Sequence, residues 1–177
     1  GAGSWGTALA LLMHNNGHQV TIWSIIGAEV EMLWTKRQHE TKLPGVLLPE
    51  AIEITGNLEE AMSGKDVLIL AVPSPFTRST ACMMKEFLKA NQKIVNVAKG
   101  IEENTLYTLS DVIEEELPCA DVAVLSGPSH AEEVGKGLPT TCVVGAHTKE
   151  TAEYLQNLFM SPVFRVYTSP DMLGIEL

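Results

Sequence analysis

Basic residues are scarce in this sequence. Its 177 residues include 12 Lys and Arg against 22 Asp and Glu, which gives a formal net charge of −10. Because a nucleic-acid partner requires Lys and Arg side chains to neutralise its phosphates, this balance argues against nucleic-acid binding. An acidic protein can still contain one locally positive site, so a small phosphorylated ligand remains compatible with the charge.

Cysteines and long apolar runs are also few. Cys82, Cys119 and Cys142 are far apart, without a C-x-x-C or a Cys/His spacing typical of metal sites. We therefore expect no metal, a small apolar role at or near the core for each cysteine, and a reducing cytoplasm. The longest apolar runs, such as Val67–Val72, are too short to span a bilayer, and no secretory signal pattern is present.

What the sequence does contain is an alternation of short apolar segments with segments of helical period. Strands are expected at 18–23, at the end of 42–55, and at 66–73, 93–98, 121–126, 140–146 and 164–168. Helices are expected at 27–38, 57–64, 75–89, 106–117 and 148–159, the second of them capped by Asn57 with Glu60 completing a capping box. This order predicts an α/β fold with a doubly wound, mainly parallel sheet and helices on both faces. Ligands of such sheets bind at the edge where the strands end.

The first residues, GAGSWG, have the spacing of a dinucleotide-binding turn. Gly1 would permit the tight turn, Gly3 would let the backbone approach a pyrophosphate, and Gly6 would let the following helix pack closely on the sheet. The helix that follows would offer its N–H groups and positive dipole end to the phosphates. A strand normally precedes this turn and none does here, so we expect the first strand to be missing. A glycine-rich helix start without a ligand is the alternative.

The end of the second expected strand carries no acidic residue for the adenosine ribose. The segment from Trp23 to Ile26 contains no Asp, Glu or Arg, and the nearest acid, Glu29, falls inside the next helix. Ser24 could bond a ribose hydroxyl or a phosphate. Without an Arg to hold a 2′-phosphate, the sequence favours NAD over NADP.

Two further loops are expected at the same edge. Lys99 follows a strand and precedes a glycine, where it is either a solvated surface residue or an ammonium that polarises a carbonyl or holds a phosphate. Gly127 and Pro128 form a rigid turn after another strand. Ser129 is predicted to cap the next helix, in a box with Glu132.

His130 follows directly in the same loop. It could transfer protons or be a hydrogen-bonded packing residue, and the sequence leaves these alternatives open.

A series of motifs runs in order through the whole chain: GAGSWGTALA, VTIW, VPS, AKGIE, VLSGPSHAEEV, GLPT, FRVYT and GIEL. From Gly1 to Leu177 the sequence resembles the bacterial-type NAD(P)-dependent glycerol-3-phosphate dehydrogenases. This resemblance implies hydride transfer between a nicotinamide cofactor and the pair dihydroxyacetone phosphate and sn-glycerol 3-phosphate, which supplies the phospholipid backbone. It implies cofactor contacts at Ser4, Trp5, Lys99 and Ala131, and substrate contacts at Lys99, Gly127 and Ser129.

The resemblance also implies a domain division. Residues 1–170 would form an NAD(P)-binding Rossmann domain lacking its first strand, and residues 171–177 would begin a helix leading to an all-helical substrate domain. That domain and the family's general-base Lys would lie beyond Leu177, so we expect the 177 residues alone to be inactive, with a homodimer forming through the absent domain.

Two alternatives remain open. One is another dehydrogenase of the same superfamily, such as a ketoacid or hydroxyacid reductase. The other is a non-catalytic dinucleotide-sensing module. The Arg that many family members carry after the second strand is Ile25 here, which also leaves the choice between NAD and NADP open.

Overall fold

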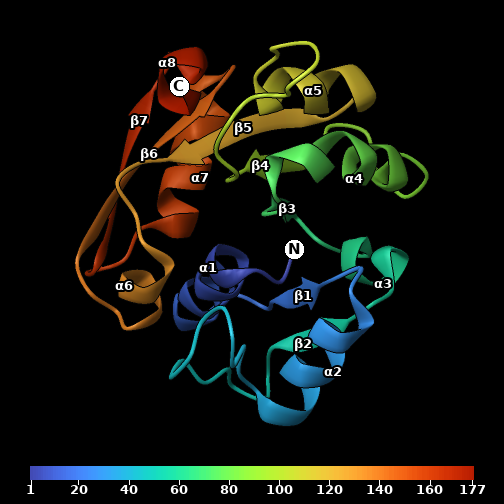
Figure 1. Cartoon of the computed structure of the whole chain (residues 1–177). Helices are drawn as coiled ribbons and strands as arrows, with labels where there is room; N and C mark the ends of the chain where they lie inside the picture. Colours follow the sequence, from blue (N-terminus) through green and yellow to red (C-terminus); the bar gives the residue numbers. More distant parts are fainter.

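The computed structural model describes all residues from 1 to 177 and contains two sheets. The larger has the order β3 (Val67–Leu70), β4 (Lys93–Asn96), β5 (Asp121–Ser126), β6 (Thr140–Ala146), β7 (Phe164–Ser169). The smaller pairs β1 (Thr21–Trp23) with β2 (Glu53–Thr55). Every neighbouring pair is parallel except β5 with β6, so the mainly parallel sheet is confirmed. Figure 1 shows the larger sheet above and the smaller one below, with α1 between them.

The helices cover both faces of the larger sheet, as expected. They are α1 (Ser4–Asn15), α2 (Gly27–Lys36), α3 (Leu58–Met62), α4 (Thr77–Met84), α5 (Leu109–Glu116), α6 (Ala131–Gly135), α7 (Lys149–Phe159) and α8 (Met172–Glu176), with a 3₁₀ turn η1 (Ser74–Phe76) before α4. Successive residues of β4 face opposite sides. Val95 is in the core cluster that includes α1, α6 and α7, and Ile94 is in the cluster that includes α4 and α5.

The two sheets are separated by a groove of about 710 Å³ between the edges of β1 and β3. Its lining includes Gly1, Gly6, and residues of both β1 and β3. The groove therefore lies beside the glycine turn.

All five helices with stated bounds are shorter than expected, and α4 and α5 differ most. The helix expected from 106 begins at Leu109, because Leu106 has a φ of +61° and Thr108 forms a complete capping box with Asp111. Backbone in the left-handed region, as at Leu106, does not continue a right-handed helix. The helix expected through residue 89 ends at Met84, and residues 85–87 form a turn instead.

Three smaller expectations had mixed outcomes. The Asn57 side chain caps α3 by accepting from Glu60 N–H at 3.3 Å, but the Glu60 carboxylate accepts from the Thr55 hydroxyl instead of completing the box. Cys142 is buried as expected, whereas Cys82 and Cys119 are exposed, so the core assignment was wrong for those two. None of the helices combines the length and the apolar character needed to cross a membrane.

Candidate cofactor and substrate site

A cavity of about 670 Å³ lies where four strands end. The chain leaves β1, β3, β4 and β5 at this edge of the two sheets (Figure 1). The lining includes the following residues of those loops and of the glycine turn: Gly1, Gly3, Ser4, Trp5, Gly6, Ser24, Pro73, Ser74, Ala98, Lys99, Ser129, His130 and Ala131. The structure therefore brings the glycine turn, Lys99, Ser129 and Ala131 together in the wall of one cavity.

The three glycines of the turn are needed for different spatial reasons. A Cβ on Gly1 would lie 2.3 Å from the carbonyl oxygen of Ala71, and one on Gly6 would lie 2.1 Å from the carbonyl oxygen of Gly1. Both glycines are therefore required by the protein's own packing. A Cβ on Gly3 would meet nothing within 4 Å. Gly3 leaves open space on the cavity side, which is where a ligand's phosphates would approach the backbone.

Backbone donors at the start of α1 are unused. Gly3 is the N-cap of α1, and its carbonyl accepts from Thr7 N–H at 2.9 Å, the first hydrogen bond of the helix. The N–H groups of Ser4, Trp5 and Gly6 have no partner in the protein. Such unpaired N–H groups, together with the helix dipole, form an anion-binding site at a helix N-terminus.

Lys99 reaches across the cavity edge from β4 to the loop after β5. Its side chain is exposed, and its Nζ donates to the carbonyl oxygen of Gly127 at 2.7 Å. Gly127 has a φ of +150°, and a Cβ there would lie 2.9 Å from the carbonyl oxygen of Thr141 and 3.0 Å from Cys142 Cα. Gly127 does not line the cavity itself, but its close packing on β6 fixes the acceptor that holds the Lys99 ammonium.

The predicted capping role of Ser129 was wrong. The helix α6 begins at Ala131 with His130 as its N-cap, and no side chain caps it. The Ser129 hydroxyl donates instead to the carbonyl of Gly127 at 3.3 Å, because the left-handed conformation of Gly127 brings that carbonyl to it. Ser129 and Lys99 consequently share one acceptor and lie together in the cavity wall.

His130 itself lines the cavity, with an exposed side chain that makes no hydrogen bond within the protein. The packing alternative offered for this residue required such a bond, which the structure does not contain.

A buried carboxylate with three polar partners occupies the β1 end of the cavity. Ser24 Oγ donates to Glu29 Oε2 at 2.7 Å, the Lys42 ammonium bonds Glu29 Oε1, and His39 Nε2 lies 3.4 Å from that oxygen. Burial raises the pKa of Glu29, but the hydrogen bonds from Lys42 and Ser24 outweigh it and hold the pKa below the ordinary value. Glu29 and Lys42 both line the cavity. Sequence reasoning discounted Glu29 and missed Lys42, which has no local signal because its partner lies 13 positions away.

The loop that carries Lys99 is also held by an ion pair a few residues further along the chain. Arg78 Nε and Nη2 donate to the two carboxylate oxygens of Glu102 at 2.7 and 2.8 Å, and Arg78 Nη1 pairs with Glu115 and Glu116. The hydrogen bonds from Arg78 lower the pKa of Glu102 to about 2. Paired N–H donors in a fixed fork give a carboxylate a defined position, so this contact fixes the loop relative to α4.

A glycine turn at a helix N-terminus, set where strand order reverses and facing a cavity at the strand ends, defines a dinucleotide-binding Rossmann domain. Residues 1–152 match the family model described as NAD-dependent glycerol-3-phosphate dehydrogenase N-terminus. The chain belongs to that family. It is 65% identical over 177 residues to a glycerol-3-phosphate dehydrogenase [NAD(P)+] of Agathobacter rectalis, and 62% identical over 179 residues to that of Fusobacterium nucleatum. All of this chain aligns with 53% of each relative, so it spans about half their length.

Solved structures agree with this assignment. A glycerol-3-phosphate dehydrogenase from Coxiella burnetii superposes with a TM-score of 0.94 and 32% identity, over 99% of this chain and 54% of that one. A UDP-D-ManNAc dehydrogenase from Pyrococcus horikoshii, at 15% identity and a TM-score of 0.77 over 99% of this chain and 47% of that one, shares the fold.

Proposed function

We propose that this chain is the cofactor-binding half of an enzyme that interconverts dihydroxyacetone phosphate and sn-glycerol 3-phosphate. The observation that carries the proposal is the convergence of the glycine turn, Lys99 and Ser129 on one cavity. The family membership and the names of the relatives support the substrate pair.

The residues present suit a dinucleotide. The free N–H groups of Ser4, Trp5 and Gly6 would hold its pyrophosphate, and the open space at Gly3 admits the phosphates. Ala131, the first residue of α6, lines the same cavity as Trp5 and would contact the cofactor there. A bound nicotinamide would supply the hydride, and the protein would supply position and electrostatics.

Lys99 would act on the substrate. Its ammonium would lie near the carbonyl oxygen of dihydroxyacetone phosphate and stabilise the negative charge that develops there. Gly127 and Ser129 would position the substrate next to it. The rest of the polypeptide would supply the general-base Lys and the helical domain implied by the resemblance, and would also form the homodimer contact.

We propose a preference for NAD over NADP. Lys42 is the cation at the end of the cavity where a 2′-phosphate would lie, and it is already paired with the buried Glu29. A neutralised ammonium offers less attraction to a second phosphate than a free one. We further propose a cytoplasmic enzyme, because its cysteines are free thiols that a reducing compartment preserves.

The test is oxidation of NADH and NADPH by the whole protein, with dihydroxyacetone phosphate assayed beside a panel of 2-ketoacids. Among these substrates, we expect turnover only with dihydroxyacetone phosphate. Turnover with a ketoacid instead would favour another reductase of the superfamily. Cofactor binding without oxidation of any substrate would favour a sensing module.

A further inference from the structure

Asn96, at the end of β4, has a fully buried side chain that forms two hydrogen bonds with Ala98, the residue before Lys99. Its Oδ1 accepts from Ala98 N–H at 3.2 Å, and its Nδ2 donates to the Ala98 carbonyl at 3.3 Å. Both backbone groups of Ala98 are thus held by one amide. Any movement of that amide is passed to the backbone from which Lys99 extends.

The third hydrogen bond of Asn96 comes from the other end of the chain. Its Nδ2 donates to Glu176 Oε1 at 3.0 Å, and the same carboxylate accepts from Ser110 N–H at 3.1 Å and from the Ser110 hydroxyl. An ionised carboxylate only accepts hydrogen bonds, so the NH₂ edge of Asn96 must face Glu176. The Asn96 oxygen is then left to accept from Ala98. Glu176 therefore determines the orientation of the Asn96 amide.

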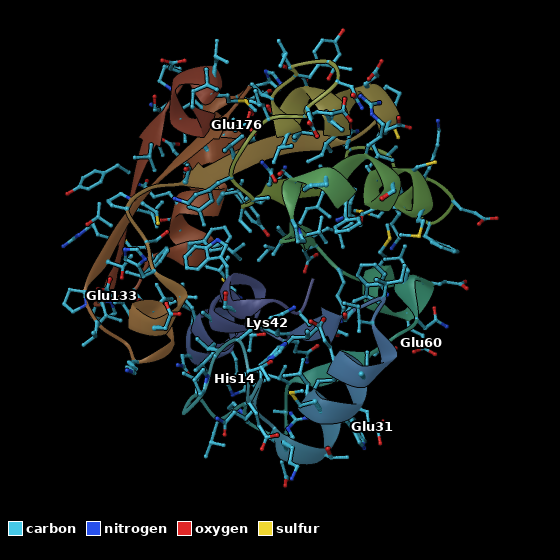
Figure 2. All side chains as sticks on the ribbon, viewed as in Figure 1. His14, Glu31, Lys42, Glu60, Glu133 and Glu176 are labelled. Carbon is cyan, nitrogen blue, oxygen red and sulfur yellow. The ribbon has the colours of Figure 1, made fainter.

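The contact between Asn96 and Glu176 lies outside the cavity but next to residues that line it. Ala98 and Lys99 line the cavity, whereas Asn96 and Glu176 do not. Figure 2 labels Glu176, the last residue of α8, on the side toward α5 and well away from Lys42. Because α8 packs on β5 and β6, a displacement of α8 would reach Lys99 through these two side chains.

We propose that Asn96 and Glu176 are positioning residues for Lys99. Glu176 orients the Asn96 amide, and Asn96 fixes the backbone from which Lys99 reaches the carbonyl of Gly127. The inference rests on the proposed function, in which the Lys99 ammonium stabilises charge on the substrate oxygen. A misplacement of about 1 Å can cost about 100-fold in rate, so loosening this path lowers kcat. The glycine turn is untouched, so cofactor affinity is retained.

The experiment compares kcat, KM and cofactor Kd in variants of the whole protein. In Asn96→Ala and Glu176→Ala, kcat falls about 10- to 100-fold while cofactor Kd changes less than about twofold. Glu176→Gln keeps most of kcat, because its side-chain oxygen still accepts from Asn96. The double variant Asn96→Ala/Glu176→Ala is no slower than the slower single variant, since both residues act through one path.

A matched control is available on α7, outside this path. The Gln156 side chain donates from Nε2 to the Val166 carbonyl at 2.8 Å, without contacting Asn96, Glu176 or Ser110. Gln156→Ala therefore removes a comparable contact and leaves kcat unchanged. If Asn96→Ala does not fold, Asn96→Asp serves instead. It keeps the acceptor for Ala98 but places a second carboxylate against Glu176, so its loss of kcat is relieved by Glu176→Gln.

A second readout needs neither cofactor nor turnover. Pyridoxal 5′-phosphate forms a Schiff base with accessible lysines. Reduction of the Schiff base followed by mass spectrometry gives the rate at which Lys99 is modified. Asn96→Ala and Glu176→Ala change this rate at least about threefold, and Gln156→Ala does not.

The inference would be overturned if Asn96→Ala and Glu176→Ala kept the wild-type kcat and the wild-type rate of Lys99 modification while Lys99→Ala was inactive. That result would leave the proposed function standing. Absence of dihydroxyacetone phosphate reduction in the wild-type protein would instead overturn the proposed function. The modification rates would then still decide whether the two residues position Lys99.

Discussion

The substitutions Gly3→Ala and Gly6→Ala separate the role of the turn in binding from its role in folding. A Cβ on Gly6 would lie 2.1 Å from the carbonyl oxygen of Gly1, so backbone must move, at a cost of about 1–3 kcal/mol. For a domain of this size that cost lowers the melting temperature by about 2–12 °C. A Cβ on Gly3 meets nothing within 4 Å, so stability changes by about 0.5 kcal/mol or less.

Cofactor binding is expected to respond differently. The new methyl group of Gly3→Ala occupies the space in which the pyrophosphate approaches the turn, and losing one hydrogen bond to a charged group costs about 1.5–3 kcal/mol. The Kd for NADH therefore rises at least about tenfold. Thermal unfolding and titration of tryptophan fluorescence with NADH measure the two effects on the whole protein. Gly27→Ala, another position where a Cβ meets nothing within 4 Å, is the control, with both properties unchanged. A Gly3→Ala protein that binds NADH like the wild type would refute the assignment of the turn.

Other substitutions test the remaining parts of the site. Lys99→Ala lowers kcat by about 10²- to 10³-fold with unchanged cofactor Kd, as expected for the loss of a charge-stabilising donor, and an unchanged kcat would remove Lys99 from the mechanism. Glu29→Gln frees the Lys42 ammonium and raises affinity for NADPH relative to NADH by about two- to fivefold, measured as a ratio of Kd values; an unchanged ratio would separate this pair from cofactor choice. The pKa of Glu102 is lowered from 4.5 to about 2 in the folded state, so its contact with Arg78 stabilises the protein above pH 4.5 and this contribution is lost as the pH falls toward 2. The stability advantage of the wild type over Arg78→Met in urea denaturation should shrink over that interval, and an advantage independent of pH would contradict it. Finally, residues 1–177 alone should bind cofactor weakly and give negligible turnover, and robust activity of this chain would show that it needs no further domain.

Local sequence signals predicted the elements whose ends depend on local chemistry. The strands β5 and β6 have the predicted bounds, because each is an apolar run between turn-forming residues. The glycine turn was visible in the sequence because a Cβ at Gly1 or Gly6 would collide with backbone, which restricts these two positions to glycine. Ser129 was misassigned because the conformation of Gly127, which depends on packing against β6, decides where its hydroxyl points.

Contacts between distant positions were not accessible from the sequence. The pair Asn96 and Glu176 is separated by 80 positions, and nothing near either residue indicates the other. The partners of Glu29 were hidden for a similar reason. The sequence analysis set Glu29 aside because it falls inside the helix expected at 27–38, whereas the loop carrying Lys42 and His39 folds back over it.

The central claim is that the glycine turn, Lys99 and Ser129 form one site for a dinucleotide and a phosphorylated substrate. A crystal structure of the whole protein with NADH and dihydroxyacetone phosphate tests it most directly. The account predicts pyrophosphate oxygens within hydrogen-bond distance of the Ser4, Trp5 and Gly6 N–H groups, and the substrate carbonyl oxygen beside Lys99 Nζ. Cofactor bound elsewhere, or substrate more than one water layer from Lys99, would contradict it.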